Sequence, residues 1–267
     1  MKVTEIICES ISLTTVTPKL NSALSNAVLH VFNSPPKSPI SKMDMQFMVK
    51  YNTVFVNAIK PILSQYAKHL TNTDVNIQFK SLTQGTGQYI EDTNTITITP
   101  KVLATLIKLL FSHYTSKINM SDVKTTVDQI TSIFLHEVTH AIQVSHGQRY
   151  EYKHGYIEHD KIKFFTALVQ DKFNSEEERQ RANEIYKSQP DEIAAYAQEA
   201  ATGLISKIHK LPHEEQVTAI DVFLRELPKQ NTYTDFKNRS NPRYEKVYRR
   251  YLKLIYQTLD NYKSSLK

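Results

Sequence analysis

Residues His136, Glu137 and His140 form a His-Glu-x-x-His segment, in which two imidazoles are separated by four positions. On an α-helix this spacing places both rings on one face, within reach of a single ion. Two neutral imidazoles and one carboxylate can hold Zn²⁺ and leave a fourth position for water, whose pKa the ion lowers towards about 7. Glu137, about 100° around the helix from His136, can accept the proton of that water as general base. The segment therefore predicts a zinc-dependent hydrolytic site.

The residues around this segment predict a buried helix. Two histidines and a glutamate that face the interior are costly to bury without a partner such as a metal ion. The alternative is a helix whose polar residues are incidental. Apolar side chains cover most of the helix circumference, namely Ile130, Ile133, Phe134, Leu135, Val138, Ala141, Ile142 and Val144.

The elements that must position these residues are mainly helical. The spacing of apolar residues predicts helices over residues 19–32 and 43–70, with a kink or break at Pro61. Residues 1–17 are rich in Ser, Thr and β-branched residues, so we expect an extended arm there. The proline-rich residues 33–39 are typical of a linker.

Strands are expected in the middle of the chain. Alternating polar and apolar residues predict strands over residues 75–79 and 95–99, with Gly85 and Gly87 as turn residues between strands. A linking helix then opens at Pro100, and the motif helix follows it. Strands followed by helices, in a chain with only 5 Gly and 10 Pro, predict a predominantly helical α+β fold with a small β-sheet.

The motif and this order of elements resemble the zincin superfamily of metallopeptidases. The similarity covers about residues 75–205 and is strongest at the motif. It implies a metalloprotease whose substrate is a peptide or protein, and an edge strand, here residues 96–99, that pairs with the extended substrate. We expect an N-terminal arm and linker (1–42), a zincin-like catalytic domain (43–210) and a C-terminal helical extension packed on it (211–267).

Zincins differ in the residue that completes the metal site. His146 has the metzincin spacing from His140, but Gln143 stands where those proteins have a bend-forming glycine. In a straight helix His146 points away from the ligand face, and its alternative role is to interact with the helix C-terminal dipole. Glu192, near the start of an alanine-rich helix, resembles the glutamate of the gluzincin arrangement. That resemblance implies Glu192 as the third metal ligand.

Several further residues are candidates for supporting roles. Ser188 and Asp191 have capping-box spacing, which predicts a helix start at Pro190. Asp191 or Glu199 is expected to orient a ligating histidine, although Asp191 is also explained as an acidic residue at a helix start.

The segment between the two helices carries an aromatic and basic loop over residues 149–159. Within it, Tyr156 and His154 are the residues that we expect to polarise a substrate carbonyl or stabilise an oxyanion.

The composition of the chain limits the kind of metal site and the cellular location that we expect. The single cysteine, Cys8, excludes an intramolecular disulfide and a zinc site built from thiolates. The first residues lack the pattern of a signal peptide, and no apolar run approaches the roughly 18–20 residues that span a bilayer. We therefore expect a cytoplasmic protein without a membrane partner, while signal-independent export or packaging in a virus particle would leave no trace in the sequence.

The net charge of +6 is mild for 267 residues. Residues 237–251 interleave basic and aromatic side chains as a nucleic-acid surface does, but helical spacing explains the aromatic residues as a packing face. We do not expect nucleic-acid binding, and the sequence does not predict an oligomeric state.

Two other functions stay open: a catalytically inactive interaction protein with a zincin-like fold, and a metal-dependent hydrolase of a non-peptide bond.

Overall fold

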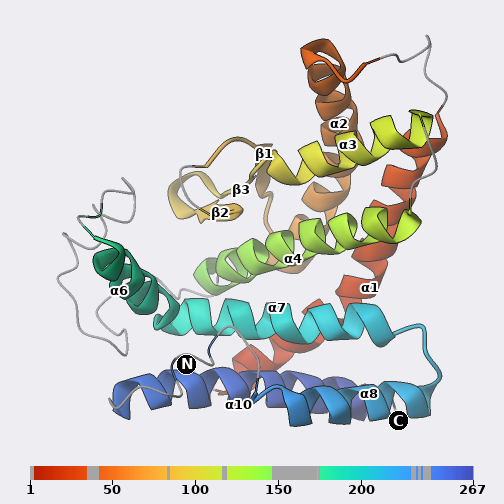
Figure 1. Ribbon diagram of the computed structural model, residues 1–267. Coiled ribbons are helices and arrows are strands. Elements are labelled where there is room, and N and C mark those ends of the chain that lie inside the picture. The colour runs from red at the N-terminus through yellow and green to blue at the C-terminus, as the bar shows by residue number, and fades with distance from the viewer. Residues whose placement is uncertain are drawn as a thin grey trace. The chain divides into compact units, whose positions relative to one another are not determined.

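The computed structural model describes residues 3–34, 42–82, 85–115, 119–145, 173, 175–229, 233, 236 and 242–266. These residues form mostly helices and one small mixed β-sheet, which confirms the predicted fold class (Figure 1). The chain divides into two compact units, one of residues Thr15–Ala141 and one of Met1–Thr14 with Ile142–Lys267. None of the described helices is long and apolar enough to cross a membrane.

The first helix, α1 (Val3–Asn33), is much longer than the sequence predicted. Residues from Val3 onwards are helical, so the extended arm expected over residues 1–17 is wrong. Leu13, Val16, Leu20 and Leu24 recur at helical spacing and are all buried. Packing of this face outweighs the low helix propensity of the surrounding Thr and β-branched residues.

Helix α2 (Met45–Thr71) begins at Asp44, whose carboxylate accepts a hydrogen bond from the backbone N–H of Phe47 at 2.9 Å. It ends at Asn72, which adopts a left-handed conformation with φ 54°. Pro61 lies inside the helix without breaking it. The buried residues of α2 recur every four positions and form a face that packs on α3 (Lys101–Thr115) and β1 (Asn76–Phe79), namely Phe47, Tyr51, Phe55, Ile59, Leu63, Ala67 and Thr71.

Three short strands form the sheet in the order β1-β3-β2. The central strand β3 (Thr95–Ile98) pairs in parallel with β1 and antiparallel with β2 (Gly87–Ile90). All four residues of β3 are buried. The expectation that residues 96–99 form a substrate-binding edge strand is therefore wrong, because neighbours occupy both edges of β3. Its Thr-Ile alternation is typical of a half-exposed strand, but in the folded protein the threonines are covered as well.

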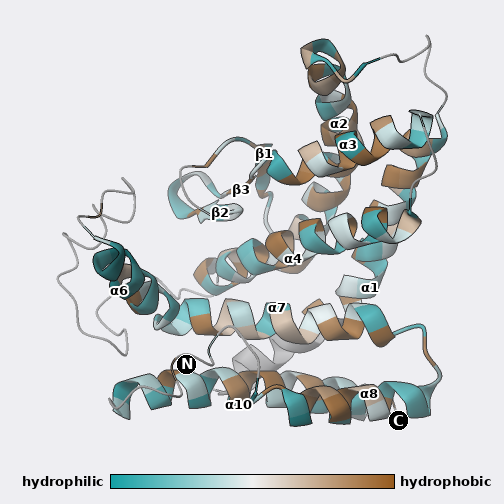
Figure 2. Ribbon diagram, in the orientation of Figure 1, coloured by the Kyte–Doolittle hydropathy of each residue, from teal (hydrophilic) through white to brown (hydrophobic). Residues whose placement is uncertain are grey.

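The unit that contains the C-terminus is helical in its described residues. Helix α10 (Pro242–Ser265) packs along α7 (Pro190–Ile208), and α8 (His213–Glu226) contacts both. Helix α6 (Glu176–Lys187) contacts α7. Figure 2 shows hydrophobic and hydrophilic residues alternating along these helices, as expected for amphipathic elements.

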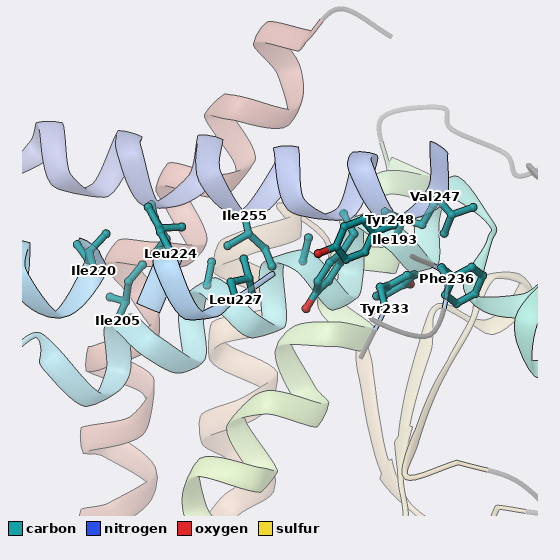
Figure 3. Close-up of a cluster of buried hydrophobic side chains, with 14 of the residues drawn as sticks. Ile193, Ile205, Ile220, Leu224, Leu227, Tyr233, Phe236, Val247, Tyr248 and Ile255 are labelled. Carbon is teal, nitrogen blue, oxygen red and sulfur yellow. The ribbon is translucent and has the colours of Figure 1, made fainter. Parts of the chain in front are cut away.

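The buried faces of α7, α8 and α10 meet in one apolar cluster (Figure 3). Val247, Tyr248, Tyr251 and Ile255 of α10 belong to it. This confirms that the aromatic residues near the C-terminus form a packing face. The cluster also includes Tyr233 from the segment after α8, which stacks on Tyr251 with a distance of 4.3 Å between the ring centroids.

Candidate metal centre

The motif lies near the end of α4 (Met120–Ser145), and the helix is buried around the motif, as predicted, although several residues of its first turns are exposed. Val123, Val127, Ile130 and Phe134 are each at most 3% exposed and form one apolar face of the helix. The helix continues without a break through Gln143 to Ser145. In metzincins a bend at the position of Gln143 brings the third histidine to the metal. The described part of this chain has no bend there.

The imidazoles of His136 and His140 converge. Their Nε2 atoms lie 3.3 Å apart, the ring centroids are 5.0 Å apart and the ring planes cross at 75°. Two nitrogens bound at about 2.0–2.1 Å to one tetrahedral ion are separated by about 3.3 Å. His136 is buried and His140 is partly buried. The pair therefore already has the nitrogen separation that a shared zinc ion requires.

The carboxylate of Glu137 lies against the sheet. An ideal Cβ placed on Gly87, the first residue of β2, would lie 2.6 Å from Oε1 of Glu137. Glu137 is only 6% exposed. The sequence interpretation of Gly87 as a turn residue is wrong, because Gly87 pairs with Ile98 within the sheet.

Helix α7 presents Glu192 in its first turn. It begins at Pro190, as predicted, but the N-cap is Gln189 and makes no side-chain capping bond. The predicted capping box of Ser188 and Asp191 is wrong. The reason is that the two helices follow each other closely, so Ser188 still ends α6 and its hydroxyl donates to the carbonyl of Ile185 at 2.7 Å. The positive end of the α7 dipole favours the two acidic residues of this first turn.

Tyr233 lies close to this helix start. Its hydroxyl donates a hydrogen bond to the backbone carbonyl of Lys187 at 3.0 Å. Burial, and after it the negative charge of Glu192, raises the pKa of Tyr233 far above its usual range. Tyr233 therefore stays protonated beside the carboxylate. Sequence reasoning missed this residue, since nothing in its local pattern sets it apart.

One ligand atom each from His136, His140 and Glu192 lies within 4.8 Å of the other two. Glu192 is 5% exposed, and the group as a whole is buried or partly buried. Two imidazole nitrogens and one carboxylate oxygen suit zinc and related divalent metals. The structure thus contains a possible metal-binding group of the type that the motif predicted.

Other predicted residues are not part of this group or are not described. Tyr156, His154 and His146 lie outside the described residues, so their roles stay predictions. Glu199 is described: burial, and after it the negative charge of Glu199, raises the pKa of Tyr251. The expectation that Asp191 or Glu199 orients a histidine stays a prediction.

Comparison of the chain with models of protein families, with curated proteins and with solved structures gives no match. The interpretation of the site therefore rests on its own residues and their geometry.

Proposed function

We propose that this chain is a zinc-dependent hydrolase, and specifically a peptidase of the gluzincin-like type within the zincins. In this proposal His136, His140 and Glu192 hold the ion, and Glu137 is the general base. The observation that carries the proposal is the close approach of one ligand atom from each of the three metal-binding residues. The two histidines belong to the one segment of the chain with the His-Glu-x-x-His pattern.

The donor set fits zinc. His136 and His140 present Nε2 atoms at a separation that one tetrahedral ion can bridge. Glu192 adds a negative charge that partly neutralises the ion in a buried site. When bound, zinc supplies Lewis acidity, which lowers the pKa of water towards about 7 and polarises a substrate carbonyl.

Glu137 supplies the proton transfer. Its carboxylate accepts the proton of the attacking water and then gives it to the nitrogen of the leaving amine. The side chain follows His136 directly, so the helix that positions the ligand also positions the base. Because Glu137 is almost fully buried, few solvent molecules compete for its carboxylate.

The free edge of β2 supports a peptide as substrate. The N–H of Thr99 donates to the carbonyl of Thr86 at 2.9 Å, which makes these two residues a hydrogen-bonded pair of the antiparallel ladder. By alternation, Gly87 and Tyr89 turn their backbone N–H and C=O groups away from β3. No strand of the described part of the chain occupies that edge. An extended peptide can add to it by backbone hydrogen bonds, directly beside Glu137.

A quenched fluorescent peptide library tests the proposal. We expect the purified protein to cleave a subset of peptides, to lose this activity with a chelator and to regain it with stoichiometric zinc. Matched ester and phosphoester substrates should be turned over more slowly. Peptide cleavage that survives complete removal of metal would contradict the proposal, and turnover of the phosphoesters alone would reassign the substrate class.

A further inference from the structure

We propose that Gly87 is a positioning residue for Glu137. The missing side chain at this position lets β2 lie directly against α4 and confines the Glu137 carboxylate on its sheet side. This inference deepens the proposed function and rests on it, because it takes Glu137 to be the base.

The contact between the strand and the helix is unusually close. A Cβ on Gly87 would lie 2.6 Å from Oε1 of Glu137, 2.9 Å from its Cγ and 2.7 Å from Cγ2 of Ile133. Ile133 and Glu137 are four residues apart on α4 and share one face of that helix. The space that a side chain on Gly87 would need is therefore occupied by the helix face that carries the base.

Glycine is required at position 87 because a side chain would collide with α4, and not because of the backbone conformation. Among the described glycines only Gly85 has a positive φ, of 74°, which disfavours any side chain. Gly87 has no such φ and lies in a regular strand, where other residues pack better than glycine. Glycine within a strand often marks a close approach of the backbone to another group, and here that group is Glu137.

A methyl group on Gly87 would displace the base. Non-bonded heavy atoms prefer separations of about 3.5 Å or more. Because the added Cβ would lie 2.6 Å from Oε1 of Glu137, this oxygen would have to move away by about 0.9 Å. A general base must lie within about 2.6–3.2 Å of its partner, and a misplacement of about 1 Å can reduce the rate by about 100-fold. The three atoms nearest to this methyl group belong to Glu137 and Ile133 and not to a metal ligand, so we expect the ligands to stay in place.

The kinetic test compares Gly87→Ala with Gly85→Ala. The second variant introduces strain in the same hairpin, but among the described residues its Cβ meets only the carbonyl of Gly87, at 3.5 Å. We expect Gly87→Ala to keep its zinc and a KM within about twofold of wild type while kcat falls about 100-fold. Gly85→Ala should lower the melting temperature and keep kcat within about twofold. Unchanged kcat in Gly87→Ala, loss of its zinc, or an equal loss of kcat in Gly85→Ala would overturn the inference.

A double-mutant cycle gives a readout that needs neither metal nor activity. Glu137→Ala removes the carboxylate and Cγ that a methyl group on Gly87 would meet. We therefore expect Gly87→Ala to lower the melting temperature less in the Glu137→Ala background than in wild type. Additive effects would show that the contact does not exist. A third outcome is that the two substitutions are coupled in stability while the wild-type protein cleaves no peptide. That outcome would refute the proposed function and still support the contact between Gly87 and Glu137.

Discussion

Asn21 of α1 donates a hydrogen bond from its side-chain amide to Oδ1 of Asp128 on α4 at 2.9 Å. The amide oxygen of Asn21 also accepts a hydrogen bond from the hydroxyl of Thr131, one turn further along α4. Asn21 and Thr131 are both buried. This buried polar contact ties α1 to α4, the helix that carries His136 and His140, and restricts its rotation about its own axis.

Replacing Asn21 should destabilise the fold. Asn21→Ala removes the acceptor of Thr131 and a donor to Asp128, so we expect the free energy of unfolding to fall by about 2 kcal/mol. Urea denaturation measures this change. Thr125→Ala is a matched control, since Thr125 is exposed on the same helix and bonds only the local carbonyl of Ser121; its effect should stay below about 0.5 kcal/mol. A variant of Asn21 as stable as wild type would show that the contact does not hold α4.

Replacing Glu137 should separate catalysis from metal binding. Glu137→Gln keeps the size of the side chain but cannot accept a proton, so we expect kcat to fall by about 10²–10⁴-fold with zinc content unchanged. Stopped-time peptide assays together with elemental analysis measure both quantities. Glu245→Gln, which changes an exposed carboxylate paired with Arg249, should have wild-type kcat. Full activity of Glu137→Gln would assign the base to another residue.

The raised pKa of Tyr233 should appear as a loss of stability at alkaline pH. In the unfolded chain a tyrosine ionises near pH 10, whereas burial keeps Tyr233 protonated in the fold. The folded state then binds more protons, so stability is complete below about pH 10 and falls as the pH rises further, by up to about 1.4 kcal/mol per pH unit for this residue.

Tyr233→Phe isolates this contribution. It removes the ionisable hydroxyl and the hydrogen bond to Lys187, so the variant should be about 1 kcal/mol less stable at neutral pH and show a shallower decline between pH 10 and 11. Urea denaturation across this pH range measures the slope. Equal slopes in both proteins would mean that Tyr233 is not buried as described.

The sequence predicted the elements that depend on local patterns. The apolar residues around most of α4 and the Pro190 start of α7 were sufficient to place His136 and His140 on a buried helix and Glu192 at the start of another helix. The wrong or missing predictions concern contacts between distant residues. The central position of β3 depends on the pairing of β1 and β2 with its two edges, which its own sequence does not specify. The role of Gly87 depends on its approach to α4, which lies about 50 residues further along the chain.

The N-terminal helix illustrates the same limit. Ser, Thr and β-branched residues disfavour an isolated helix, whereas the burial of residues such as Leu13 and Val16 favours α1 in the folded protein. Asn21 was missed for a related reason, because a single asparagine within a helix carries no local sign of its hydrogen bonds to α4.

Metal content tests the central claim most directly. Purified wild-type protein, His140→Ala, Glu192→Ala and the control Glu226→Ala, which changes an exposed carboxylate paired with Lys229, are dialysed against sub-stoichiometric chelator and measured by elemental analysis. We expect about one zinc per chain in the wild type and the control, and almost none in His140→Ala and Glu192→Ala. Zinc that is absent from the wild type, or retained by Glu192→Ala, would contradict a centre built from His136, His140 and Glu192.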